Sequence, residues 1–205
     1  MASRGASTRN KILEVAEQII LKKGFSATSI EEIIGQAHIT KSGFFYHFAG
    51  KNELAQGLVD RFLVEDARIF NEMMERARSL SEDPLQQMLI FMKLMAEMMA
   101  DIPNGHPGCL VASFTYESMQ FDQQVLDGVR QGMLDWRTIF GEQLQRVADA
   151  YPMKIETSVD DLADGITTAM EGGIVVSLTI GDPEILVRQL LIYRNHLRLL
   201  FGDVS

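Results

Sequence analysis

Cysteine is nearly absent from this chain of 205 residues, in which Cys109 is the single example. One cysteine excludes an internal disulfide framework and suits a reducing cytoplasm. No window approaches the roughly 18 apolar residues that a membrane-spanning helix requires, and no apolar run follows the first charged residue as in a signal peptide. The sequence therefore predicts a soluble, cytoplasmic protein.

Motifs that mark catalytic or metal sites are also lacking. The sequence contains no Glu-x-x-His pair, phosphate-binding loop or nucleophile motif. Asp160, Asp161 and Asp164 form an acidic cluster, but carboxylates at the start of a helix are explained by favourable interaction with the helix dipole. We expect neither an enzyme nor a bound cofactor or metal.

Positive charge is scarce overall, with a formal net charge of −9, but it is unevenly distributed. Residues 1–51 contain seven Lys or Arg and four Glu, a net charge of +3, whereas residues 52–205 contain twelve basic and twenty-four acidic residues. The local field at the contact surface governs phosphate binding. The acidic total therefore does not exclude a nucleic-acid partner for the first 51 residues.

The sequence also lacks a convincing β-strand pattern, and apolar residues recur at helical spacing throughout. We predict an all-α protein of about nine helices. The first 51 residues would form one domain, residues 52–205 a second, and a helix running to about residue 80 would link them. Six of the predicted helices cover residues 8–23, 40–48, 51–80, 109–120, 158–180 and 183–201. The other three begin at the cap Thr28, at Asp83-Pro84 and at the cap Asp122.

The first domain has the spacing of a helix-turn-helix. Thr28-Ser-Ile-Glu31 reads as a capping box, in which the Thr28 hydroxyl and the Glu31 carboxylate satisfy each other's backbone amides. Only His38 and Ile39 separate this helix from the next, for which Thr40 is a plausible N-cap. A two-residue connection of this kind is typical of DNA-binding helix pairs.

Five rings follow one another in this third helix, from Phe44 to Phe48. Successive helical positions point about 100° apart, so five neighbouring rings cannot all enter one core. We assign Phe44 and Phe48 to the core because buried Phe is the commoner case. The remaining rings then lie on the surface beside Thr40, Lys41 and Ser42.

These residues resemble the DNA-binding domain of the TetR family of bacterial transcriptional regulators. The similarity runs from Thr40 to Leu54 as Thr-Lys-Ser-Gly-Phe-Phe-Tyr-His-Phe-x-x-Lys-x-Glu-Leu, preceded by Thr28-Ser-Ile-Glu-Glu-Ile and the Gly24-Phe25 turn. The resemblance implies a homodimeric DNA-binding regulator, by default a repressor, that is released from a near-palindromic operator by a small molecule. The family commonly has Tyr at the position of Phe45, whose hydroxyl meets a phosphate.

The resemblance and the residue types together define a predicted DNA-binding set. Residues at the start of the third helix would reach base edges, while flanking side chains and the amides at the start of the second helix would hold phosphates. Lys41 could donate to guanine, and Gly43 would let the backbone approach closely. The set is Thr28, Thr40, Lys41, Ser42, Gly43, Phe45, Tyr46, His47 and Lys51.

The second domain is rich in methionine and aromatic residues, which suit an adaptable apolar pocket. The effector is therefore expected to be apolar or aromatic, although any one of these side chains could be an ordinary core residue. An alternative is a repressor that senses electrophiles or oxidants through Cys109, because a helix N-terminus favours the thiolate. The predicted effector-binding set is Met88, Phe91, Met92, Met95, Cys109, Phe114, Met133, Trp136 and Phe140.

The last two predicted helices are expected to form the dimer interface as a four-helix bundle. Small residues at Gly165, Ala169, Gly172, Gly173 and Ser177 would permit close approach, and Leu186, Leu190, Leu197 and Leu200 would form an apolar seam. Two reading helices would then lie about 34–36 Å apart. The alternative to a DNA-binding regulator, from another functional class, is a helical binding module without DNA function.

Overall fold

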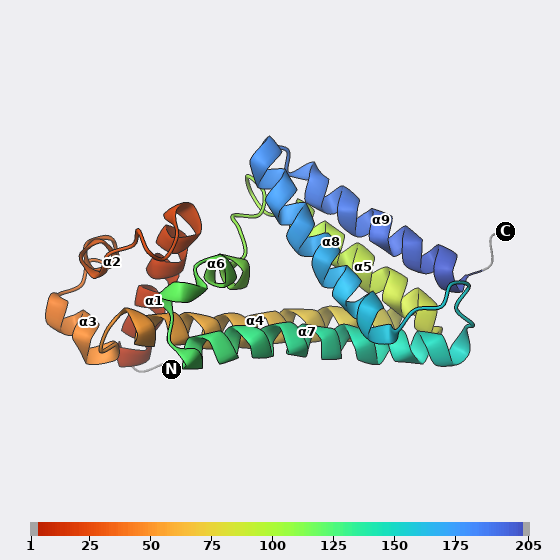
Figure 1. Ribbon diagram of the computed structural model, residues 1–205, viewed down its shortest axis with the longest axis horizontal. Helices are drawn as coiled ribbons and strands as arrows, with labels where there is room; N and C mark the ends of the chain where they lie inside the picture. The colour runs from red at the N-terminus through yellow and green to blue at the C-terminus, as the bar shows by residue number, and fades with distance from the viewer. Residues whose placement is uncertain (1–3, 203–205) are drawn as a thin grey trace. The chain divides into compact units, whose positions relative to one another are not determined.

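The structure, a computed structural model, describes residues 4–202. Within that range the chain forms nine α-helices, one short 3-10 helix and no strand, so the all-α prediction is confirmed (Figure 1). The helices are α1 (Arg4–Lys23), α2 (Ile30–Ala37), α3 (Lys41–His47), α4 (Lys51–Leu80), α5 (Pro84–Ala100), α6 (Leu110–Tyr116), η1 (Ser118–Gln120), α7 (Gln123–Ala150), α8 (Val159–Ile180) and α9 (Glu184–Phe201). None of the described helices is long and apolar enough to cross a membrane.

Side-chain caps fix several helix starts close to the positions that the sequence predicts. The Thr40 hydroxyl accepts from the Gly43 amide at 3.0 Å, and the Asp83 carboxylate accepts from the Gln86 amide at 2.7 Å. Ser158 caps α8 in the same way. Each cap satisfies one of the backbone amides that have no partner inside the helix.

Two predicted helices differ in detail from the structure. The cap of α2 is Ser29, whose hydroxyl accepts from the Glu32 amide at 3.2 Å, because the Thr28 hydroxyl instead donates to the Gly24 carbonyl at 2.8 Å. The single helix expected over 109–120 is two, because the backbone leaves helical geometry at Glu117, with φ −103° and ψ 26°.

The chain divides into two compact units that interleave in sequence. The first comprises residues 1–64 and 107–132, and the second comprises residues 65–106 and 133–205, so α4 and α7 each contribute to both. The predicted functional boundary near residue 51 remains a prediction. The first unit holds nine basic and nine acidic residues, whereas the second holds ten basic and nineteen acidic ones. The entire acidic excess of the protein therefore lies in the second unit.

The core of the first unit is built by α1 to α3 and the start of α4. Ile12, Leu13 and Ile33 are fully buried, as are Phe44 of α3 and Leu54 of α4. Burial of apolar side chains from all four helices fixes α3 on its neighbours, because each such side chain contributes about 1.5–3 kcal/mol.

The second unit is a bundle in which α9 packs against both α5 and α8. A methyl group at Gly173 would lie 2.8 Å from Leu186 Cδ1, so this glycine serves the packing of α9 on α8 within one chain. Leu186, Leu190 and Leu197 are likewise buried inside the chain. The small-residue stripe and leucine seam that we assigned to the dimer interface are therefore wrong at these positions, because packing within the chain already buries them.

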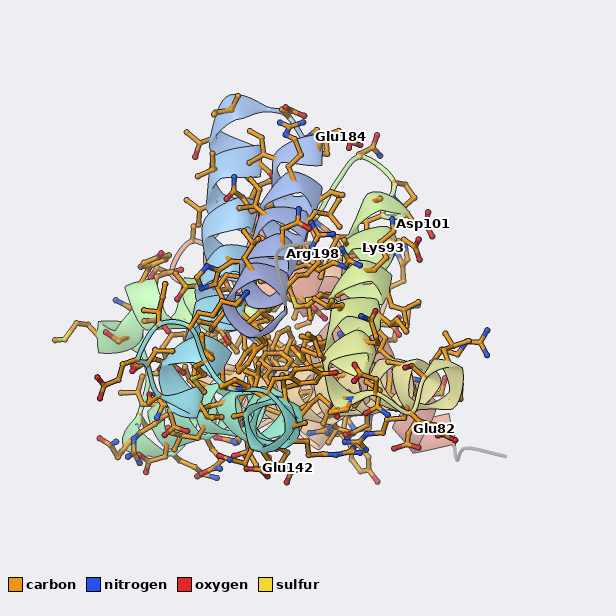
Figure 2. The ribbon with its side chains drawn as sticks, turned by 90° about the vertical axis from the view of Figure 1, so that its right-hand side faces the viewer. Glu82, Lys93, Asp101, Glu142, Glu184 and Arg198 are labelled. Carbon is orange, nitrogen blue, oxygen red and sulfur yellow. The ribbon has the colours of Figure 1, made fainter. Side chains whose placement is uncertain are left out.

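Polar side chains surround this bundle and carbon fills its interior (Figure 2). Glu82, Asp101, Glu142 and Glu184 lie at its periphery and are exposed. A buried polar contact also lies inside: the Gln143 amide group donates to the Pro84 carbonyl at 3.0 Å and to Gln87 Oε1 at 3.1 Å. These hydrogen bonds satisfy amides that would otherwise be costly to bury.

Candidate DNA-binding surface

Helix α3 is held by two rings that face the core. Phe44 is 0% exposed and Phe48 is 1% exposed, and their ring centroids lie 5.8 Å apart. The Arg9 guanidinium lies 5.1 Å from the centroid of the Phe48 ring, a cation–π contact between α1 and the end of α3. The assignment of Phe44 and Phe48 to the core is confirmed.

The N-terminal edge of α3 presents a row of small polar groups and one cation. Thr40, Lys41 and Ser42 are exposed, and the hydroxyls of Thr40 and Ser42 lie 3.1 Å apart. A methyl group at Gly43 would lie 3.2 Å from the Thr40 hydroxyl oxygen, so glycine here also leaves room for the cap. The Lys41 ammonium lies 3.9 Å from a Glu31 carboxylate oxygen, and both side chains are more than two-thirds exposed. Exposed pairs of this kind contribute little, so Lys41 is available to another partner.

Two rings of α3 face outward, as the helical spacing requires. Phe45 is 45% exposed and its ring meets Phe44 edge-on at 5.4 Å, while Tyr46 is 82% exposed. His47 is half-buried and its ring lies 4.9 Å from that of Tyr46. Large exposed apolar groups on a short polar helix indicate a contact surface.

Thr28 and Lys51 of the predicted set are engaged inside the first unit. Thr28 is 2% exposed and donates to Gly24. The Lys51 ammonium donates to the Phe25 carbonyl at 2.7 Å and lies 4.2 Å from the centroid of the Phe25 ring. Burial lowers the pKa of Lys51, the nearby Glu117 carboxylate opposes this shift, and Lys23 adds to it.

Most of the predicted effector-binding residues lie in the second unit. Met88, Met92 and Met95 of α5 are fully buried, and Met133 is half-buried. Phe91, Trp136 and Phe140 form an aromatic cluster around Phe70 of α4, with centroids 6.3, 6.0 and 5.3 Å from the Phe70 ring. We did not predict Phe70, although its helical spacing from Met73 and Met74 places it on the same apolar face.

Two members of that set, Cys109 and Phe114, belong to the first unit. Phe114 stacks on Phe121 with centroids 4.4 Å apart and meets Phe25 edge-on at 5.5 Å. Cys109 is 7% exposed, and its side chain does not cap the start of α6. Sequence reasoning also missed Glu117, which binds the backbone of Phe25 and Ser26; an isolated surface Glu carries no sequence signal of such a long-range contact.

Two stretches of the chain match the models of known protein families. Residues 12–58 match the family of bacterial regulatory proteins called tetR, and residues 84–191 match the tetracyclin repressor-like C-terminal domain. The chain belongs to the TetR family. Its helix-turn-helix, formed by α2 and α3, is therefore the DNA-binding element of a transcriptional regulator.

Individual relatives of this TetR-family protein are distant but extend over most of its length. The HTH-type transcriptional regulator YxaF of Bacillus subtilis is 28% identical over 186 residues, which is 89% of this chain and 90% of that protein. The HTH-type transcriptional repressor DhaR of a Mycobacterium species is 21% identical and spans 82% of this chain and 80% of its own. A crystal structure of a TetR-family regulator from Agrobacterium tumefaciens has a TM-score of 0.80 at 20% identity, covering 97% of this chain and all of that one.

Proposed function

We propose that this TetR-family protein is a homodimeric repressor that binds a near-palindromic operator through α3 and is released by a small, largely apolar effector. The observation that carries the proposal is the outer face of α3. Thr40, Lys41 and Ser42 are exposed there beside the exposed rings of Phe45 and Tyr46. A recognition helix of this kind presents its N-terminal residues to base edges in the major groove.

The contacts divide into those that read sequence and those that fix register. Lys41 donates to guanine O6 or N7, and Phe45 makes van der Waals contact with a thymine methyl group or a sugar. Tyr46, His47 and the amides that follow Thr28 at the start of α2 bind phosphates. Lys51 carries three ammonium protons, of which the Phe25 carbonyl takes one, so the others serve a phosphate.

Dimerisation uses the faces of α8 and α9 that the chain itself leaves uncovered. Val175 and Val176 of α8 are 44% and 43% exposed, and Ile192 and Leu199 of α9 are 59% and 53% exposed. Gly172 lies on the same face of α8 as Val175 and Val176, and a methyl group there would meet no atom within 4 Å. An apolar face on two neighbouring helices supports an isologous four-helix interface.

DNA binding is tested by selecting sequences from a random duplex pool and titrating the selected operator at several salt concentrations. We expect a two-fold symmetric sequence, and the logarithm of affinity should fall linearly with the logarithm of salt by about 0.9 for each phosphate contacted. Binding that is absent for every duplex, or independent of salt, would defeat the proposal.

The dimer interface can be tested with a pair of matched substitutions in the second unit. Ile192→Glu places a carboxylate on the α9 face, whereas Ile155→Glu makes the same change at another exposed isoleucine, 65% exposed and outside any helix. We expect only Ile192→Glu to convert the dimer to monomers in analytical ultracentrifugation. Equal masses for both variants would argue against this interface.

Effector binding has an internal reporter, because Trp136 is the single tryptophan of the chain. It is 2% exposed and lies in the aromatic cluster with Phe70. A small aromatic compound that releases the operator should change Trp136 emission with the same concentration dependence. Release without any change in emission would place the effector away from this cluster.

A further inference from the structure

The turn that leaves α1 is held by a carboxylate from a distant part of the sequence. Glu117 follows α6 directly, and one of its carboxylate oxygens, Oε1, accepts from the Phe25 amide at 2.6 Å. The other oxygen, Oε2, accepts from the Ser26 amide at 2.8 Å and from the Ser26 hydroxyl. The partners are 91 and 92 residues apart in sequence, so this contact joins the two sequence segments, residues 1–64 and 107–132, that make up the first unit.

Lys51 binds the same turn with the opposite charge. The peptide group that joins Phe25 and Ser26 donates its N–H to Glu117, while its carbonyl accepts from the Lys51 ammonium at 2.7 Å. Both polar ends of one peptide group are thus bound by charged side chains. Hydrogen bonds to charged groups are roughly twice as strong as neutral ones, which favours a single position of the turn.

Backbone geometry and apolar packing fix the turn from other directions. Gly24 has φ +87°, a conformation that side chains rarely adopt, and a methyl group there would lie 2.8 Å from Glu117 Oε1. The Phe25 ring is 3% exposed and packs on Phe114 and Phe121, at 5.5 and 4.5 Å between centroids. The segment from α6 to Phe121 therefore contacts the turn through the apolar rings of Phe114 and Phe121 and through the Glu117 carboxylate. Glu117 and Lys51, which bind the turn with opposite charges, are called the clamp below.

The position of this turn determines where α2 begins. The Thr28 hydroxyl donates to the Gly24 carbonyl, and Ser29 then caps α2. Lys51 is the first residue of α4, so the two clamp residues connect the start of α2, the start of α4 and the end of α6. The starts of α2 and α4 present backbone amides and the Lys51 ammonium to phosphates in the proposed complex.

We infer that Glu117 is a positioning residue for DNA binding, which aligns the start of α2 with α3 and α4 although it lies beyond the helix-turn-helix in sequence. This inference rests on the proposed function. The inference and the charge effect predict opposite results for removal of this carboxylate. Loss of the negative charge raises the local positive potential and should strengthen DNA binding, whereas loss of the hydrogen bonds that position the turn should weaken it.

The test compares Glu117→Ala and Glu117→Gln with Glu14→Gln in the full-length protein. Glu14 is an exposed carboxylate of α1 in the same unit, so its neutralisation reports the charge effect alone. We expect operator affinity to fall about tenfold in Glu117→Ala, roughly the effect of losing one net hydrogen bond to a charged group, and less in Glu117→Gln, which retains one acceptor oxygen. The salt dependence should stay unchanged, because Glu117 binds no phosphate. Affinity in Glu117→Ala equal to or above that of Glu14→Gln would overturn the inference.

A second readout does not depend on DNA. The amides of Phe25 and Ser26 should exchange with deuterium about tenfold faster in Glu117→Ala, while the amides inside α1 keep their protection. Unchanged exchange at these two amides would also overturn the inference. Operator binding by the wild type and by Glu14→Gln reports separately on the proposed function, so the two failures are distinguishable.

Discussion

Phe45→Tyr should tighten DNA binding by restoring the hydroxyl that the TetR family commonly carries at this position. Phe45 is 45% exposed, so an added hydroxyl remains in water in the free protein and costs little stability. On DNA it gains a hydrogen bond to a phosphate, which has a net contribution of about 0.5–1.5 kcal/mol. This corresponds to roughly a two- to tenfold lower Kd.

Fluorescence anisotropy with a labelled duplex measures this effect. A phosphate contact carries no sequence information, so the gain should be similar for the selected operator and for an unrelated duplex. The matched control is Phe44→Tyr, one residue earlier, where the side chain is 0% exposed. A hydroxyl buried there without a partner should destabilise the protein by about 1–3 kcal/mol in urea unfolding.

A phosphate contact at this ring would be ruled out if Phe45→Tyr bound neither duplex more tightly while Phe44→Tyr behaved as expected. The exposed ring would then face away from the phosphates, and its role as a contact residue would have to be reassigned. A gain for the operator alone would instead indicate that the new hydroxyl reaches a base edge.

Lys41, Glu117 and Cys109 each make a further testable difference to binding, stability or reactivity. Lys41→Ala should cost about 1–3 kcal/mol on the operator and relax preference at one or two base pairs, measured by repeating the selection; unchanged preference at every position would contradict a base contact. Burial raises the pKa of Glu117, but hydrogen bonds from Ser26 and Phe25 and the charge of Lys51 outweigh it, so the pKa lies below its usual range. The clamp's contribution to stability should be complete above the usual carboxylate pKa and lost as pH falls through the lowered one, and Glu117→Gln should remove that part of a pH titration of unfolding. Iodoacetamide should alkylate Cys109 more slowly in the native protein than after denaturation, because the residue is 7% exposed; a faster native rate would support the electrophile-sensing alternative.

Local features were predictable because their signals are local. The caps at Thr40 and Asp83, the start of α8 near residue 158, the ends of α4 and the division of rings in α3 each depend on residues within about one helical turn. Thr28 shows the limit of such reasoning. Its hydroxyl had two possible local partners, and the conformation of the turn at Gly24 selected the one that leaves Ser29 to cap α2.

The sequence by itself determined the helices, the family and the outer face of α3, because periodicity, capping and motif spacing are carried by neighbouring residues. Tertiary structure alone decided which apolar residues remain for a partner: the predicted leucine seam of α9 is buried inside the chain, whereas Val175, Val176 and Ile192 stay exposed. It also decided that Glu117 and Lys51 bind one peptide group. Contacts between residues 91 apart depend on how the helices pack, and a single sequence carries no periodic signal of them.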